Sequence, residues 1–239
     1  MLNIIYEDKD IIIVNKPSGQ LSQGARGFDL DLVSEVMTYN RSKGNPAYAA
    51  IINRLDRPVS GLVLIAKNKS AAAAYSTAMQ KNGGFNKQYE ALVCGKLPEE
   101  SGIFVDYLKK DSNTNTSSVV PEKKAASDKD GKLSKLEYEV ISYDDVNDIS
   151  HIKIHLITGR HHQIRVQFAS RNHPLIGDYK YNTCNIDIDK TANSCGFDMD
   201  KAVKSCHLGR NQIALCATSI TLNGKEFNIE AGFNYHAGL

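Results

Sequence analysis

The chain contains the stretch Arg54-Leu55-Asp56-Arg57-Pro58-Val59-Ser60-Gly61-Leu62-Val63-Leu64-Ile65-Ala66, in which a charged loop leads into an apolar strand. Pro58 biases Arg57 away from the helical conformation, and Gly61 permits a turn. A second apolar run, residues 51–55, precedes the loop. Short apolar runs bounded by turn residues are typical of buried strands. The stretch therefore predicts two strands joined by a loop that carries Asp56.

Both ends of the chain predict hairpins. Apolar residues 4–6 and 11–14 flank a polar segment, and Lys16-Pro17-Ser18-Gly19 then ends the second strand. Near the other end, Asn223-Gly224 joins residues 213–222 to residues 225–229, and this dipeptide is the strongest short hairpin signal. Alternating apolar residues predict three further strands, at residues 87–93, 136–140 and 151–156.

Three helices are expected among these strands. Residues 29–40 place apolar side chains four apart, with Asp29 as the cap, and residues 68–81 begin at Asn68, another good cap. The third covers residues 160–171, with Ile164 and Phe168 on its buried face. Residues 109–135 and 182–204 have polar compositions that predict a flexible insertion and a loop-rich segment. We therefore expect an α+β fold with a mostly antiparallel mixed sheet, forming a single domain over residues 1–239.

Composition limits where the protein can work. No apolar run approaches the ~20 residues that a membrane helix needs, and the first residues lack the basic and apolar regions of a signal peptide. The five cysteines are an odd number in a chain too long to need disulfide staples. We therefore expect reduced thiols and a cytoplasmic protein.

Charge is distributed unevenly along the chain. The formal net charge is only +2, yet no acidic residue lies between Asp148 and Asp178, a window that holds four basic residues and five histidines. A local positive patch on a nearly neutral protein suits a polyanionic ligand. The alternative, a basic surface balanced by acidic residues elsewhere in space, stays open at this point.

The loop around Asp56 has two possible roles. Arg54 and Arg57 favour the ionised carboxylate, which can act as a nucleophile or a base, and arginines bind phosphate. Alternatively, Asp56 braces a turn and pairs with a neighbouring arginine. Residue types alone do not decide between these roles.

A second basic motif is Thr158-Gly159-Arg160-His161-His162-Gln163-Ile164-Arg165, which follows a strand and opens the third predicted helix. Helix N-termini attract anions, and Arg165 lies just over one turn beyond Arg160. A phosphate ligand is one interpretation, and a solvated basic helix face is the other.

We expect neither metal nor cofactor. His161 and His162 are adjacent and so do not share a helical face, while Cys195, Cys206 and His207 lack the paired spacings of zinc sites. The chain also has no glycine-rich nucleotide loop and no Gly-x-Ser-x-Gly nucleophile motif.

Four ordered motifs resemble the RluA-type pseudouridine synthase family over nearly the whole chain. They are the opening hairpin up to Lys16-Pro17-Ser18-Gly19, the loop Arg54-Leu55-Asp56-Arg57 with Ser60-Gly61-Leu62, the segment Lys87-Gln88-Tyr89-Glu90-Ala91-Leu92-Val93, and Thr158-Gly159-Arg160 with His162-Gln163-Ile164-Arg165 and His173-Pro174-Leu175-Ile176-Gly177-Asp178. The resemblance implies the pseudouridine synthase fold with a central catalytic cleft. It also implies a catalytic domain without the N-terminal S4 RNA-binding module that many relatives carry.

The resemblance also implies residue roles. Asp56 matches the essential aspartate, Tyr89 the active-site tyrosine and Arg165 the basic partner of the aspartate. Arg54 matches the arginine that takes the place of the everted uridine. We further expect Arg57, Arg160, His162 and Gln163 to contact RNA. Asn53 and Cys216 depart from the family pattern, since many relatives have His at each position, and this affects substrate detail more than activity.

The function implied is the isomerisation of specific uridines in rRNA or tRNA to pseudouridine by a monomer that needs no metal. Two alternatives remain. One is a non-catalytic RNA-binding or RNA-folding protein on the same scaffold, and the other is a metal-dependent hydrolase of nucleotides. The joint presence of Asp56, Tyr89 and Arg165 argues against the first, and the lack of a carboxylate and histidine cluster argues against the second.

Overall fold

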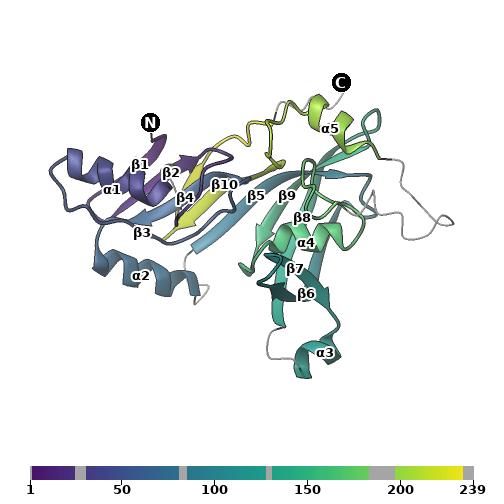
Figure 1. The fold of residues 1–239 in the computed structure, drawn as a ribbon, viewed down its shortest axis with the longest axis horizontal. Helices are drawn as coiled ribbons and strands as arrows, with labels where there is room; N and C mark the ends of the chain where they lie inside the picture. The colour runs from purple at the N-terminus through teal and green to yellow at the C-terminus, as the bar shows by residue number, and fades with distance from the viewer. Residues whose placement is uncertain (1, 25–30, 81–84, 128–130, 183–196, 234–239) are drawn as a thin grey trace. The chain divides into compact units, whose positions relative to one another are not determined.

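The computed structural model describes residues 2–24, 31–80, 85–127, 131–182 and 197–233 (Figure 1). The chain divides into two compact units, Met1–Gln88 with Cys216–Ala231 and Tyr89–Leu215 with Gly232–Leu239. These are called the first and the second unit below, and each is described by itself. The single catalytic domain expected from the sequence stays a prediction.

The first unit contains a mixed sheet with the strand order β1-β2-β4-β10. All its pairings are antiparallel except that of β10 with β4, and the two short strands β3 and β11 pair with β4 and β10. Both predicted hairpins are confirmed. The strands are β1 (Ile4–Glu7), β2 (Ile11–Lys16), β3 (Ala50–Ile51), β4 (Ser60–Ala66), β10 (Leu215–Leu222) and β11 (Lys225–Asn228). Of the strand predicted at residues 51–55, only Ile51 lies in a strand, because β3 ends there.

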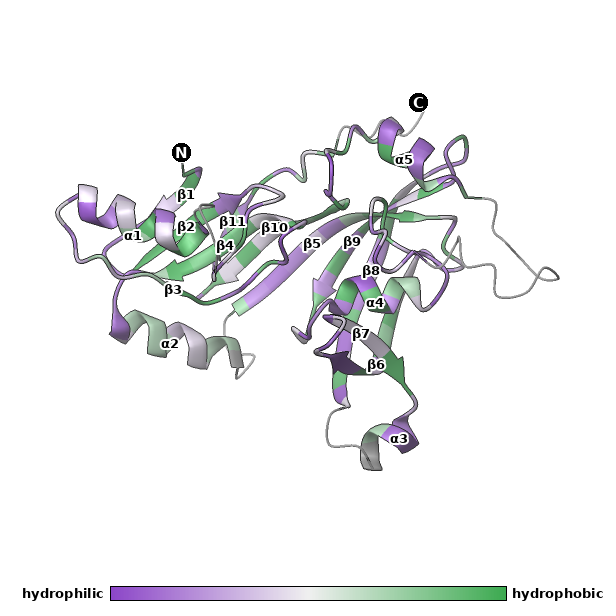
Figure 2. Cartoon of the chain, viewed as in Figure 1, coloured by the Kyte–Doolittle hydropathy of each residue, from purple (hydrophilic) through white to green (hydrophobic). Residues whose placement is uncertain are grey.

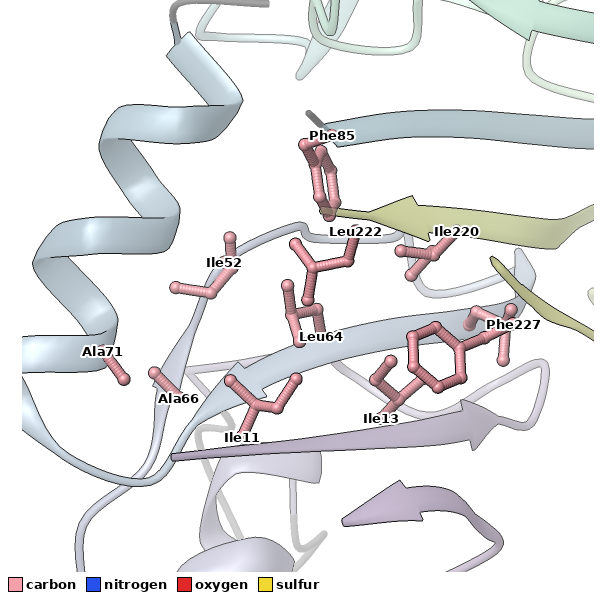
Figure 3. Close-up of a cluster of buried hydrophobic side chains, with 11 residues drawn as sticks. Ile11, Ile13, Ile52, Leu64, Ala66, Ala71, Phe85, Ile220, Leu222 and Phe227 are labelled. Atoms are coloured by element: carbon pink, nitrogen blue, oxygen red, sulfur yellow. The ribbon is translucent and has the colours of Figure 1, made fainter. Parts of the chain in front are cut away.

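The first unit contains an apolar cluster that joins its central strands (Figure 3). Ile11 and Ile13 of β2 face Leu64 and Ala66 of β4, and Ile220 of β10 completes the layer. Figure 2 shows β2 and β4 as largely hydrophobic ribbons, in keeping with their near-complete burial. Each such side chain contributes about 1.5–3 kcal/mol when fully buried, so this cluster fixes the register of the strands that precede and follow the Asp56 loop.

Two helices belong to the first unit. In α1 (Leu32–Ser42), Asp31 caps the N-terminus by accepting a 2.7 Å hydrogen bond from the Ser34 N–H. The cap predicted at Asp29 lies outside the described residues, and the described helix begins at Leu32, later than the predicted residue 29. In α2 (Lys69–Gln80), the Asn68 side chain accepts from the Ala71 N–H at 2.9 Å, which confirms that cap.

The second unit contains a sheet with the strand order β5-β9-β8-β6-β7. The pairs β8–β9, β6–β8 and β6–β7 are antiparallel. The strands are β5 (Phe85–Cys94, of which the residues from Tyr89 belong to this unit), β6 (Ser101–Asp111), β7 (Thr116–Val120), β8 (Lys132–Asp144) and β9 (Ile149–Leu156).

Residues 109–135 are more regular than their composition predicted. The end of β6, all of β7, the short helix α3 (Glu122–Ser127) and the start of β8 lie within them. Their polar side chains suit one solvent-exposed face of a β-hairpin, whereas the backbone is ordered by pairing with neighbouring strands. The described residues of this segment therefore form regular elements, whereas the flexibility of the insertion stays a prediction.

Two short helices complete the second unit. All seven residues of α4 (Gln163–Ala169) are buried, and Phe168 lies edge-on to Phe104 and Tyr138 with ring centroids 4.9 and 5.8 Å away. The helix is shorter than the predicted 160–171, because His162 has a left-handed backbone (φ 53°) that a right-handed helix cannot include. Helix α5 (Met199–Ser205) lies partly in the predicted loop 182–204, of which residues 183–196 are outside those described.

These elements confirm the predicted α+β class with a mostly antiparallel mixed sheet. Among the described residues, no helix is long and apolar enough to cross a membrane.

Candidate active site

The Asp56 loop belongs to the first unit and connects β3 to β4. Leu55 and Val59 are buried, whereas Asp56 is half-buried and the flanking Arg54 and Arg57 are exposed. The Val59 N–H donates to the Asp56 carbonyl at 3.1 Å, which closes a turn around Arg57 and Pro58. The carboxylate is therefore carried at the start of a closed turn, between two buried apolar anchors.

The segment after β2 holds this loop through its backbone. The Ser22 hydroxyl donates to the Leu55 carbonyl at 2.7 Å and accepts from the Leu55 N–H at 3.2 Å. Gly19 and Arg57 also exchange two hydrogen bonds, from the Gly19 N–H to the Arg57 carbonyl and from Arg57 Nε to the Gly19 carbonyl, both 2.8 Å long. Asp56 is thus fixed on both sides by Ser22 and Gly19, two residues for which sequence analysis gave no such role.

Lys16 supplies a buried positive charge beside the loop. Its ammonium donates to the carbonyls of Pro17, Gln20 and Arg57 at 2.9, 2.9 and 3.4 Å, and the residue is fully buried. Burial lowers the pKa of Lys16 to about 8, while the attraction of the Asp56 carboxylate partly offsets this effect. The Lys16 charge therefore acts electrostatically on Asp56 and also ties the loop to the end of β2.

Asn53, which departs from the family pattern, braces the loop against β4. Its buried amide accepts from the Leu64 N–H at 2.7 Å and donates to the Leu62 carbonyl at 3.1 Å. Cys216, the other departure, is buried in β10 opposite Ser60. Both departures are thus accommodated inside the first unit.

Gly61 ends the loop under a tight steric requirement. Its φ is +117°, and a Cβ there would lie 2.4 Å from both the N and the O of Ala217 in β10. Only glycine permits this approach of β4 to β10 directly after the turn.

In the second unit, Arg165 is held by a buried ion pair within the unit. Its Nε and Nη2 donate to the two carboxylate oxygens of Asp178 at 2.7 and 2.8 Å, and both side chains are at least 94% buried. The guanidinium also lies 5.1 Å from the ring centroid of Tyr181. The pairing of Arg165 with Asp56 stays a prediction, and the fork to Asp178 was not foreseen, although Asp178 closes one of the quoted motifs.

His162 precedes α4 and is bonded to the same tyrosine. Its Nδ1 lies 2.6 Å from the Tyr181 hydroxyl, and the rings of His161 and His162 stack with centroids 3.7 Å apart. Burial, followed by the positive charges of Arg165 and its neighbours, lowers the pKa of His162 to about 2. His162 is therefore a neutral imidazole at every physiological pH.

The side chain of Gln163 is fully used within the unit. Its carbonyl oxygen accepts from Thr158 Oγ1 and the Arg160 N–H at 2.8 and 3.0 Å, and its amide donates to the Lys135 carbonyl and Gln167 at 3.2 and 3.0 Å. These bonds fix the turn that begins α4. The RNA contact predicted for Gln163 stays a prediction beside this structural role.

The remaining predicted residues also lie in the second unit. Arg160 is exposed, and its Nε donates to the Leu133 carbonyl at 3.0 Å. Tyr89 is a buried residue of β5. The structure thus groups Arg54, Asp56 and Arg57 on one loop of the first unit, and Arg160, His162, Gln163 and Arg165 at the start of α4 in the second.

Metal ligands and thiols form no cluster in the described part of the chain. No group of three or more His, Cys, Asp or Glu residues there could hold a metal ion. The side chains of Cys94, Cys206 and Cys216 are buried.

Comparison with known proteins gives concordant matches. The family model for RNA pseudouridylate synthase matches residues 10–170. The ribosomal large subunit pseudouridine synthase D of Blochmanniella floridana is 34% identical over 80% of this chain, and an uncharacterised RNA pseudouridine synthase of Aquifex aeolicus is 31% identical over 79%. The solved structure of human RNA pseudouridylate synthase domain containing 4 aligns with a TM-score of 0.72 at 18% identity, covering 95% of this chain and 88% of that one.

The chain spans 58% of the length of each of these two curated relatives. The structural match at 18% identity shows the fold, and the family model extends over the Asp56 loop and the Arg165 helix alike. On these matches, the chain belongs to the RNA pseudouridylate synthase family.

Proposed function

We propose that this protein isomerises uridine in RNA to pseudouridine, with Asp56 as the catalytic carboxylate. The observation that carries the proposal is the way the loop is built. A half-buried carboxylate lies on a turn whose backbone is held by Ser22, Gly19 and the buried ammonium of Lys16. An acid that served only to brace the turn would not need this second layer of support.

The reaction breaks the bond between N1 of uracil and C1′ of the sugar, turns the base and joins its C5 to C1′. The C5 hydrogen leaves as a proton, and N1 gains one, so no cofactor is consumed. Asp56 could attack C1′, add to C6 of the base or remove the C2′ proton. All three routes require an ionised carboxylate, and the Lys16 charge favours that form.

The other site residues have distinct roles in this proposal. Arg165 pairs with Asp56 and Tyr89 packs against the uracil. A base must leave its stack before it can react, and Arg54 fills the space that it vacates. Arg57, Arg160, His162 and Gln163 contact RNA in this proposal. Gln163 also supports the turn that begins α4.

Large-subunit ribosomal RNA is the substrate class that we propose, because a 34% identical relative is named as a ribosomal large subunit pseudouridine synthase. The reaction would take place in the cytoplasm and be carried out by a monomer. Modification of transfer RNA instead is an outcome that the experiment below distinguishes.

The test is pseudouridine mapping of total RNA from cells that lack the gene and are complemented with variants. Asp56→Asn removes the charge while keeping the shape of the side chain, and we expect it to abolish conversion. The matched control is Asp145→Asn, at an exposed turn residue between β8 and β9. We expect the control to restore the modified positions in ribosomal RNA.

Purified proteins complete the test. Asp56→Asn should bind substrate RNA within about twofold of wild type, because the carboxylate contributes to the reaction rather than to phosphate binding. Conversion by Asp56→Asn near the wild-type rate would reject the catalytic assignment. Activity lost in chelator would instead favour a metal-dependent enzyme.

A further inference from the structure

We propose that Tyr181 is a positioning residue, whose hydroxyl fixes which imidazole nitrogen of His162 carries the hydrogen and whose ring orients the Arg165 guanidinium. This inference rests on the proposed function, in which Arg165 and His162 act on the substrate. Tyr181 lies after the last quoted motif, and nothing in its residue type alone singles it out.

The hydroxyl of Tyr181 has defined partners. The Ser117 N–H of β7 donates to Tyr181 Oη at 2.8 Å, and His162 Nδ1 lies 2.6 Å from the same oxygen. A phenol has one hydrogen to donate, and the amide already occupies an acceptor position. A hydroxyl that accepts the amide hydrogen becomes a stronger donor, so we assign its hydrogen to His162 Nδ1, which places the hydrogen of the imidazole on Nε2.

The surroundings of His162 keep its imidazole neutral, so the position of its single hydrogen is open to selection. Its pKa is lowered to about 2 by burial and then by the charges of Arg165, His161, Lys180 and Lys110. The ring therefore does not become doubly protonated near neutral pH, and a neutral imidazole has two tautomers of similar energy in water. A single hydrogen-bond donor at Nδ1 selects one of them.

The ring of Tyr181 has a second task. The Arg165 guanidinium carbon lies 5.1 Å from the ring centroid, within the range of a cation–π contact, while its nitrogens are bound by Asp178. Asp178 restrains the guanidinium along its edge, and Tyr181 restrains it from one face. The tyrosine thus sets the orientation of Arg165 and the tautomer of His162 together.

The same tyrosine stabilises the unusual backbone of His162. A non-glycine residue in the left-handed region costs about 1 kcal/mol or more, and His162 has φ 53°. Two bonds to β7 offset this cost. One runs through Tyr181 to the Ser117 N–H, and the other joins His161 Nδ1 and Ser117 Oγ at 2.8 Å. The β6–β7 hairpin, which lies partly in the predicted insertion 109–135, thereby supports the start of α4.

The experiment compares Tyr181→Phe, Tyr181→Leu and the control Tyr179→Phe. The phenylalanine keeps the ring and removes the hydroxyl, whereas the leucine removes both. Tyr179 is a nearby exposed tyrosine whose hydroxyl is bonded to Asp200 and not to the site. The readouts are nitrogen NMR of the imidazoles in the free protein and single-turnover conversion of a substrate RNA.

In wild type we expect a protonated Nε2 and an unprotonated, hydrogen-bonded Nδ1 for His162. Tyr181→Phe should give a mixture of tautomers and a conversion rate reduced about tenfold, with RNA affinity within about twofold. Tyr181→Leu should lower the rate further, because Arg165 also loses its restraint. Tyr179→Phe should match wild type in both readouts.

Two results would overturn the inference. One is a His162 ring protonated on Nδ1 in wild type, and this measurement does not depend on the folding of any variant. The other is Tyr181→Phe with the wild-type tautomer and rate. Failure of the proposed function would look different, since Asp56→Asn would then stay active while the NMR result on His162 is unaffected.

Discussion

A buried ammonium needs oxygen atoms in place of water, and Lys16 finds them in three backbone carbonyls around the Asp56 loop. Carbonyls are dipoles without net charge, so they compensate only part of the loss of hydration. This explains why burial lowers the pKa of Lys16 to about 8 even though the Asp56 carboxylate raises it.

This shift predicts how stability depends on pH. The folded pKa is below the unfolded value of 10.5, so the cost of burying the charge is complete below about pH 8 and falls as pH rises towards 10.5. Relative to Lys16→Met, wild type should therefore gain up to about 3 kcal/mol of unfolding free energy over this interval. Urea unfolding of both proteins from pH 7 to pH 10 measures this gain, and parallel curves would contradict it.

Arg165 and Asp178 form the second buried charge site, and removing one partner should differ from removing both. Arg165→Met leaves a carboxylate that is 99% buried without its fork, at an expected cost of about 3–5 kcal/mol. Adding Asp178→Asn removes that charge and should recover much of the loss. Thermal unfolding of the two variants measures the difference.

The rate of RNA conversion should not recover together with the unfolding free energy in the double variant. If Arg165 acts on the reacting centre, the double variant folds but converts RNA at least tenfold more slowly than wild type. A double variant that recovers both stability and rate would assign Arg165 a structural role alone. Asp178→Asn by itself serves as the control for loss of the fork.

The steric contact of β4 with β10 is the element-scale feature on which the loop depends. Gly61→Ala places a Cβ against the Ala217 backbone at a positive φ, and should cost about 3–5 kcal/mol of unfolding free energy. Gly44→Ala is the matched control, since Gly44 also has a positive φ (+76°) but no atom within 4 Å of the added Cβ. The control should lose only about 1–2 kcal/mol.

Elements whose signal is local were predictable from sequence. The Asn223-Gly224 hairpin and the Asn68 cap follow from residue conformation and short-range hydrogen bonds, and both are present. The strand β7 within residues 109–135 was not predicted, because it is held by pairing with β6, which composition does not reveal. Helix α4 was overextended because the left-handed turn at His162 depends on Tyr181 and Ser117, distant in sequence.

The same division holds for the candidate site. Motif spacing singled out Asp56 and Arg165, but it could not show the bonds from Lys16 and Ser22 to the Asp56 loop, or those between Asn53 and β4. Those bonds use backbone groups, so nothing in the spacing of the motifs demands them. Asp178 and Tyr181 were hidden for the same reason, since their roles arise only from tertiary contacts.

At the scale of the whole molecule, each unit contains an apolar cluster of its own among the described residues. Ile13, Leu64 and Ile220 belong to the cluster of the first unit, while Leu92, Ile149 and Ile176 belong to that of the second. Two such clusters can act as separate cores, of which one opens without the other. Buried thiols distributed over both units allow this to be measured.

Cys216 reports on the first unit and Cys206 on the second, and each is 2% exposed. Cys216 lies opposite Ser60, next to Gly61, so Gly61→Ala should open the surroundings of Cys216 first. A loss of about 3 kcal/mol of unfolding free energy corresponds to roughly 100-fold faster labelling of the Cys216 thiol. We expect less than threefold faster labelling of the Cys206 thiol. Burial raises the pKa of Cys206, but comparing variant with wild type at one pH cancels this effect.

The labelling is read by mass spectrometry in a background where Cys184 and Cys195, outside the described residues, are replaced by Ser. Gly44→Ala again controls for a small general loss of stability. Equal acceleration at Cys216 and Cys206 would mean that the two cores open as one cooperative unit. Selective acceleration at Cys216 would instead show that the Asp56 loop is stabilised by the first unit alone, which is what the hydrogen bonds of Lys16, Ser22 and Asn53 require.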